Sequence, residues 1–133
     1  MIVAALLLSL PPALAAEHGE APSGVPTDAP VFVNLQPIVL PVIERNAVTR
    51  QIGILLTLEL GTGQSAESIE PKRRQLVDAF MQELYRIYDA RSGANRVVDE
   101  GVVKARLLRT ADSVLGAGVV HAILIRQLTE QQR

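Results

Sequence analysis

Thr49 to Leu60 reads TRQIGILLTLEL, a stretch in which apolar and polar side chains alternate. The apolar residues of one parity are Ile52, Ile54, Leu56, Leu58 and Leu60, and Val48 continues the series toward the N-terminus. A period of two residues predicts a β-strand that buries one face and exposes the other. Leu55 is the only apolar residue of the opposite parity, so we expect this strand to contact a core on one side only.

The preceding stretch, Val31 to Ile43 (VFVNLQPIVLPVI), is also rich in aliphatic residues, but it contains Pro37 and Pro41. Because proline lacks the N–H group that a strand donates to its neighbour, we expect an edge strand or a bulged strand here. The apolar residues change parity after Pro37, which is typical of a β-bulge. Residues 44–47 (ERNA) then form a polar connection short enough for a hairpin.

After a glycine-containing turn at residues 61–63, the apolar period becomes helical. The spacing predicts a helix of about five turns that begins near Pro71, with Glu67 and Glu70 placed to favour its N-terminus. The predicted apolar stripe of this helix consists of Leu76, Val77, Phe80, Met81, Leu84, Ile87 and Tyr88.

A second helix is expected after a break at residues 91–95, with Asp99 as its N-cap and with Gly116 and Gly118 ending it. Its apolar stripe is Val103, Leu107, Ala111, Val114 and Leu115. Val119 to Leu128 carries apolar residues on both parities, which is typical of a strand that is covered on both sides or is central in its sheet. The sequence therefore predicts one α+β domain of order β-β-α-α-β over residues 31–132.

Met1 to Ala16 (MIVAALLLSLPPALAA) is apolar and ends in small residues, as a signal peptide does. A membrane-spanning helix needs about 20 apolar residues, and Pro11 and Pro12 interrupt this run. We therefore expect a signal peptide, the alternative being a truncated membrane anchor. Residues 17–30 contain three prolines and are expected to form a flexible linker. Both alternatives place the rest of the chain outside the cytoplasm.

Composition narrows the classes of function. The 13 basic and 14 acidic residues give a net charge of -1, so no net field attracts nucleic acid. The absence of cysteine excludes disulfides, thiolate catalysis and cysteine-ligated zinc. Aromatic residues make up only 3% of the chain, which argues against a site that stacks sugars or bases.

The sequence lacks the familiar catalytic motifs: it has no serine nucleophile elbow, phosphate-binding loop or HExxH run. His18 lies between Glu17 and Glu20, but three ligands on a linker make a poor metal site. His121 shares the parity of Ile123 and is expected to be a hydrogen-bonded structural residue. We therefore expect a protein that is not an enzyme and has no catalytic residue, metal or cofactor.

The candidate interaction surface is charged. Lys72-Arg73-Arg74 opens the first predicted helix, where each cation opposes the helix dipole by roughly 0.3 to 1 kcal/mol. This placement suggests that the run meets acidic groups such as Asp99 and Glu100 of a neighbouring copy. The alternative is a solvated helix face on which Arg74 pairs with Asp78. The same two interpretations apply to a second basic row, formed by Lys104, Arg106 and Arg109.

Several motifs resemble the periplasmic domain of the FliL family of flagellar basal-body-associated proteins. Pro30 to Leu40 (PVFVNLQPIVL) is similar to the proline-containing first strand of that family, YVxLxPFVVNL. Leu58 to Leu60 (LEL) is similar to the end of its hairpin strand, and Ile69 to Arg73 (IEPKR) to the Ile-x-Pro-x-Arg start of its long helix. Glu100-Gly101 is similar to the start of its second helix. The resemblance covers Pro30 to about Gln131, where the closing strand ends in glutamine.

The resemblance implies a stomatin-like (SPFH-like) α+β domain and a non-enzymatic scaffold in the periplasm. In that family the domain forms a ring around the stator units of the flagellar motor and contacts the periplasmic segment of the stator protein MotB. It also implies self-association and attachment to the inner membrane if the N-terminal segment is retained. The alternative is a general periplasmic adaptor or binding domain with the same fold and no role in motility.

Overall fold

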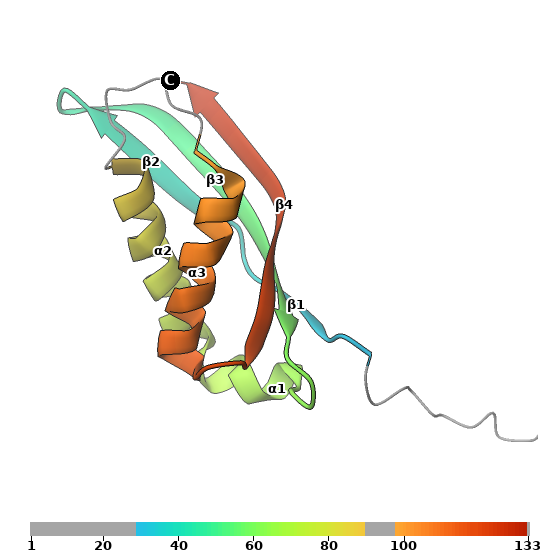
Figure 1. Cartoon of the computed structure of the whole chain (residues 1–133). Coiled ribbons are helices and arrows are strands. Elements are labelled where there is room, and N and C mark those ends of the chain that lie inside the picture. Colours follow the sequence, from blue (N-terminus) through green and yellow to red (C-terminus); the bar gives the residue numbers. More distant parts are fainter. Residues whose placement is uncertain (1–28, 90–97, 133) are drawn as a thin grey trace, which may run out of the picture.

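The computed structural model describes residues 29–89 and 98–132. In chain order the elements are β1 (Phe32–Asn34), β2 (Ile38–Glu44), β3 (Ala47–Leu60), α1 (Ala66–Ile69), η1 (Glu70–Lys72), α2 (Arg73–Asp89), α3 (Glu100–Leu115) and β4 (Val120–Gln132). The strands form one antiparallel sheet, and α2 and α3 lie side by side on one of its faces (Figure 1). This confirms the α+β class. The predicted signal peptide, residues 17–28 of the predicted linker and the predicted break at 91–95 lie outside the described residues.

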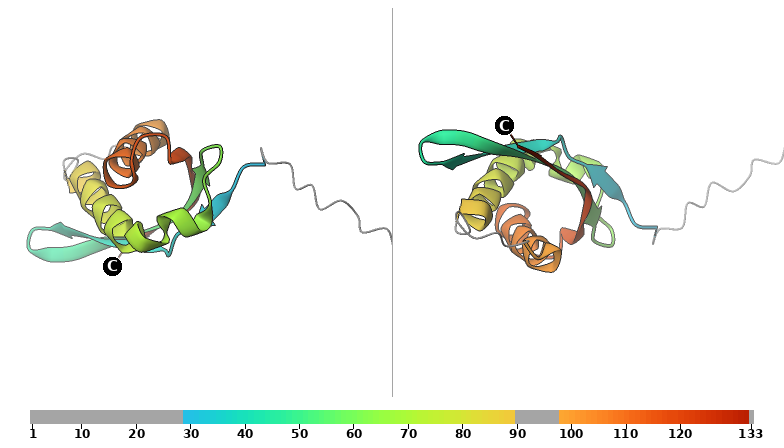
Figure 2. Two further views of the ribbon diagram at one scale, coloured as in Figure 1. Left: turned by 90° about the horizontal axis from the view of Figure 1, so that it is seen from below. Right: turned by 90° about the horizontal axis from the view of Figure 1, so that it is seen from above.

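β3 is the central strand, and its alternation is the one that the sequence predicted. β1 and β2 lie end to end along one edge of β3, and β4 follows the other edge. Five of the six predicted inner residues of β3 are buried: Ile52, Ile54, Leu56, Leu58 and Leu60. Val48 is the exception at 39% exposed, because the register against β2 shifts between Val48 and Arg50. The helices cover this face of the sheet. The β2–β3 hairpin reaches beyond the helices, as Figure 2 shows from two sides.

The proline-containing segment lies at the sheet edge as predicted, but it forms two strands. Asn34 pairs with Thr57 and Ile38 pairs with Ile54, so three residues (35–37) face two residues of β3 (55 and 56). One extra residue on this edge is the bulge that the parity change predicted. At its far end β2 turns into β3 through Arg45 and Asn46, whose φ angles of 50° and 66° define a two-residue type I′ hairpin.

The first helical region begins earlier than the sequence indicated. The chain enters a helical path at Ala66, and α1, η1 and α2 follow one another without an intervening loop. Pro71 therefore lies inside η1 and not at a free helix start. The predicted stripe of α2 is correct: Leu76, Phe80, Leu84 and Ile87 are buried, and Val77, Met81 and Tyr88 pack against them.

The second helix has the predicted caps and stripe. The Asp99 side chain accepts a hydrogen bond of 3.1 Å from the Val102 N–H, and Gly116 and Gly118 take φ angles of 104° and 80°. The turn after α3 also meets the end of β3, because the Gly61 N–H donates to the Val119 carbonyl over 2.9 Å. A Cβ atom at Gly61 would lie 2.3 Å from the Gly118 carbonyl oxygen, so this junction requires glycine.

The prediction for the last strand was wrong in one respect. β4 is an edge strand, because β3 occupies the centre of the sheet. Val120 and Ile123 are buried, whereas the strand is largely exposed from Arg126 onward. The register of β4 against β3 shifts twice. Apolar residues on both parities therefore reflect these bulges, which change the face that a side chain occupies.

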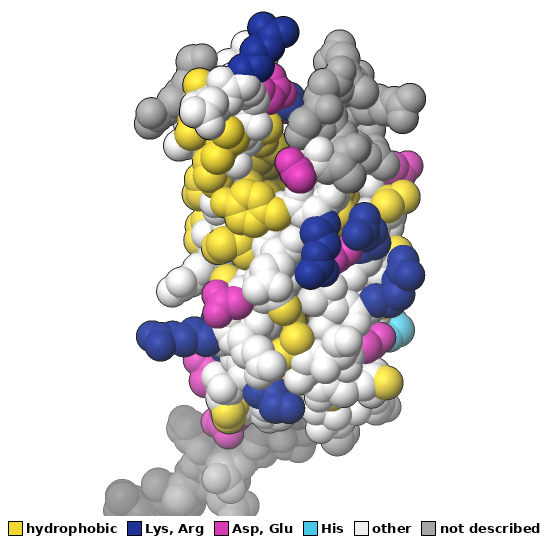
Figure 3. All heavy atoms as spheres, turned by 90° about the vertical axis from the view of Figure 1, so that its left-hand side faces the viewer, with side chains coloured by type: hydrophobic (Ala, Val, Ile, Leu, Met, Phe, Trp, Pro, Cys, Tyr) yellow, Lys and Arg dark blue, Asp and Glu magenta, His cyan; other side chains and the backbone are white. Residues whose placement is uncertain are grey.

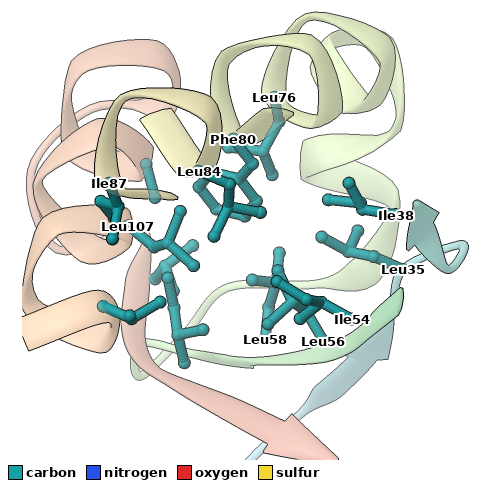
Figure 4. Close-up of a cluster of buried hydrophobic side chains, with 14 of the residues drawn as sticks. Leu35, Ile38, Ile54, Leu56, Leu58, Leu76, Phe80, Leu84, Ile87 and Leu107 are labelled. Carbon is teal, nitrogen blue, oxygen red and sulfur yellow. The ribbon is translucent and has the colours of Figure 1, made fainter. Parts of the chain in front are cut away.

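The core lies between the helices and the inner face of the sheet. Figure 4 shows Leu76, Phe80 and Leu84 pointing from α2 toward Leu56 and Leu58 on β3. Phe80, Leu56 and Leu58 are all fully buried, which confirms that α2 and β3 share one core. Within the described ranges, none of the helices has both the length and the apolar character needed to cross a membrane.

Candidate interaction surface

The basic run lies at the start of α2. Lys72 ends η1, and Arg73 and Arg74 are the first two residues of α2. A cation in the first turn of a helix opposes the helix dipole. Arg73 and Arg74 therefore have the unfavourable placement that the sequence indicated.

Two of the three cations make contacts within the domain. The Lys72 Nζ atom lies 3.3 Å from the Val114 carbonyl oxygen, near the C-terminal end of α3. A cation at that helix end satisfies a free carbonyl and is favoured by the helix dipole. The Arg73 guanidinium donates to Glu70 over 2.8 Å and to the carbonyl of Asn34, the last residue of β1, over 3.3 Å. Lys72 and Arg73 thus join the start of α2 to α3 and to the sheet.

Arg74 differs from its two neighbours because its exposed side chain has no ion pair or hydrogen bond with the described residues. Within residues 29–89 and 98–132, the predicted ion pair between Arg74 and Asp78 does not form. Arg74 is therefore the member of the run that is most available to a partner.

The acidic candidates lie at the other end of the helix layer. α2 and α3 run in opposite directions, so the start of α3 lies beside the end of α2 (Figure 1). Asp99 caps α3, and Glu100 pairs with Lys104 at 2.5 Å. Within one chain, the basic run therefore does not contact Asp99 and Glu100. Their separation at opposite ends is the arrangement that a head-to-tail contact between copies requires.

In the second basic row, Arg106 joins α3 to α2, whereas Lys104 and Arg109 contact groups of α3 itself. The Arg106 guanidinium lies 2.5 Å from Glu83 of α2, and Glu83 also accepts from Arg86 at 3.2 Å. The Glu83 side chain is only 12% exposed, so this shared carboxylate lies at the contact between α2 and α3. Arg109 is exposed and contacts the carbonyl of Ala105 on its own helix.

The histidines do not form a site in the described structure. His18, with Glu17 and Glu20, lies outside the described residues. His121 is exposed, which corrects the expectation that it is a structural residue of the core face. The cause is the register shift beside it, where Glu59 pairs with Ala122 and Leu60 pairs with Val120. No group of three or more potential metal ligands occurs in the described ranges.

The structure reveals a groove that the sequence interpretation missed. It runs between β2 and the C-terminal half of α2, has a volume of about 270 Å³, and is lined by Leu40, Pro41, Val42, Ile43, Tyr85, Arg86, Tyr88 and Asp89. Burial raises the pKa of the Tyr88 hydroxyl, with a smaller contribution from the charge of Glu130. Figure 3 shows hydrophobic side chains gathered on this side of the molecule.

One signal in the sequence could have indicated an exposed apolar surface on the strand beside this groove. Ile43 is 61% exposed and Val39 is 53% exposed, although both are large and apolar. They lie on the parity of β2 opposite to that of its buried residues. Aliphatic residues on the solvent parity of a proline-containing edge strand are a feature that hydrophobic periodicity alone does not explain.

Comparison with known proteins does not assign the chain to a family. No model of a protein family matches it, and no curated protein matches it. Its function must therefore be inferred from its sequence motifs and its geometry.

Proposed function

We propose that this chain is a non-enzymatic scaffold of the bacterial flagellar basal body, with a FliL-like, stomatin-like periplasmic domain. The domain forms a ring-like homo-oligomer around or beside the stator units and contacts a MotB-like stator protein. It acts in the periplasm or at the periplasmic face of the inner membrane and supports flagellar rotation. It needs no cofactor and does not bind nucleic acid.

The observation that supports this proposal is the order in which family-like motifs fall on the structural elements. Pro30 to Leu40 contains β1 and the start of β2, and Leu58 to Leu60 ends β3. Ile69 to Arg73 leads into α2, and Glu100 begins α3. Each motif is short, but their order and spacing agree with one domain. Short motifs that coincide with the boundaries of helices and strands are more informative than the same residues at arbitrary positions.

The ring contact in this proposal joins opposite ends of neighbouring domains. Lys72, Arg73 and Asp99 already make contacts within the chain. Arg74 at the start of α2 is exposed. Glu100 at the start of α3 pairs with Lys104 of its own helix, but its side chain is 61% exposed. We therefore assign the main charge contact between copies to Arg74 and Glu100. Such a contact is heterologous and closes into a ring if the rotation per subunit allows it. Charges at the rim chiefly set orientation and weaken as salt rises.

The test is charge reversal followed by sedimentation velocity at low and high salt. Arg74→Glu should reduce assembly, and the double variant Arg74→Glu/Glu100→Lys should restore it because the pair is re-formed with opposite signs. Arg126→Glu is the matched control, since Arg126 is also exposed and the net charge changes equally. Equal assembly of the Arg74 variant and the control at all salt concentrations would exclude this ring contact.

A further inference from the structure

The free edge of β2 is the structural basis of the inference. Among the described strands, β2 pairs only with β3, so its other edge has no partner strand. In a two-residue hairpin, the residues that flank the turn bond to each other, which here are Glu44 and Ala47. The N–H and C=O groups of successive residues point alternately to the two edges of a strand. Those of Glu44 point to β3, so the backbone groups of Ile43, Pro41 and Val39 point to the open edge.

Pro41 is compatible with this assignment, because a proline in a strand belongs where its nitrogen faces away from the ladder. The open edge therefore offers the N–H groups of Val39 and Ile43 and the carbonyls of all three residues. Only one donor is missing. An incoming strand would still find most of the bonds of a normal antiparallel or parallel ladder.

The groove described above lies directly beside this edge. Leu40 and Val42 form its sheet side, and Tyr85 and Tyr88 form its helix side. A strand added to β2 would place every second side chain into the groove, because side chains alternate between the two faces of a sheet. The apolar lining selects an aliphatic side chain at that position.

The charge beside the groove indicates a second feature of the occupant. Arg86 lines the groove and its side chain is 68% exposed. Its carboxylate partner, Glu83, also binds Arg106, so two guanidinium groups share one carboxylate. Asp89 also lines the groove and already has an interaction of its own. An acidic side chain from outside would therefore be bound by Arg86, since arginine binds a second carboxylate readily through its several donors.

We propose that the open edge of β2 and the adjoining groove bind an extended peptide segment of a partner protein, which adds a strand to the sheet. The segment places an aliphatic side chain against Tyr85 and Tyr88 and an acidic side chain beside Arg86. A second copy of the chain fits less well at this edge, because pairing β2 with β2 would place two prolines in the new ladder. This site is independent of the ring contact, which uses the starts of α2 and α3.

The experiment selects a phage-displayed library of random 12-residue peptides on the immobilised full-length chain. The enriched peptides should alternate aliphatic and polar residues and contain Asp or Glu near an aliphatic position. Hydrogen exchange of the complex should show new protection of the Val39 and Ile43 amides. A selection that enriches no peptide above an uncoated surface overturns the proposal.

Two variants then test the edge and the charge separately. Val39→Pro removes one N–H that faces the open edge. It should weaken binding of the selected peptide about tenfold, which is the effect of one lost hydrogen bond. Val39→Thr retains the N–H and should bind like the wild type. If Val39→Pro does not fold, Arg86→Glu tests the proposal instead. This variant should bind the acidic peptide more weakly, and a peptide in which Lys replaces the acidic residue should regain binding.

The proposal is wrong if the selected peptides bind the folded Val39→Pro variant as tightly as the wild type, or if Arg86→Glu leaves their affinity unchanged. It is also wrong if the Val39 and Ile43 amides are already protected in a dimer of the free protein, because the occupant is then a second copy.

Discussion

Replacing Phe80 with alanine is the most direct perturbation of the core. Phe80 is fully buried and points from α2 toward β3 (Figure 4). A buried Phe→Ala change costs about 3 to 5 kcal/mol in lost transfer energy and cavity formation. A domain of this size has only about 5 to 15 kcal/mol of stability. Since 1 kcal/mol corresponds to about 4 to 8 °C in Tm for a domain near 100 residues, the variant should melt at least about 12 °C lower.

Tyr85→Ala is the matched control, because it also removes an aromatic ring from α2 but at a position that is 39% exposed. It should lower the free energy of unfolding by no more than about 1 kcal/mol. The assay is urea unfolding followed by circular dichroism at 222 nm. The variants are compared only if the free energy of unfolding depends on urea concentration with the same slope in each. If both variants lose the same stability, or if Phe80→Ala loses less than about 1 kcal/mol, the assigned packing of α2 on β3 is wrong.

Three further predictions concern Gly61, Asp99 and Tyr88. Gly61→Ala should destabilise the domain by about 1 to 3 kcal/mol in urea unfolding, because its Cβ would lie 2.3 Å from the Gly118 carbonyl oxygen; unchanged stability would show that this turn moves freely. Asp99→Ala removes the cap on the Val102 N–H and should cost about 1 kcal/mol, whereas Asp99→Asn should retain most of it. Burial raises the pKa of Tyr88 above that of the unfolded chain, so its contribution to stability is complete below about pH 10 and is lost as the pH rises through the folded value. Unfolding measured between pH 9 and 11 should therefore depend less on pH in Tyr88→Phe, and an identical profile would contradict the assignment.

The sequence predicted the parts of the fold that depend on local periodicity. The alternation in β3 and the stripe of α2 identified buried faces correctly, because each element contacts the core with one face. The caps at Asp99 and Gly116 were also predictable, since they depend on the chemistry of single residues. The bulge after Asn34 followed from a parity change that any antiparallel pairing would have to absorb.

The features that depend on tertiary position were not predictable in this way. The place of β4 at an edge follows from which strand pairs with β3, and two register shifts obscure its parity. The contacts of Lys72 and Arg73 join segments 42 and 39 residues apart in the chain. A charge run in a sequence does not reveal such contacts. The groove beside β2 requires α2 to pack next to an edge strand, which no local pattern specifies.

The central claim is that this chain supports flagellar rotation as a structural component. The most direct measurement is the swimming speed, in media of increasing viscosity, of a strain from which the chain has been deleted and of the same strain complemented with the wild-type chain. The deletion should slow swimming most at high load, where stator support matters most, and the wild-type chain should restore the speed. Swimming that is unchanged by the deletion at every viscosity would contradict the motor role and favour a periplasmic adaptor without a function in motility.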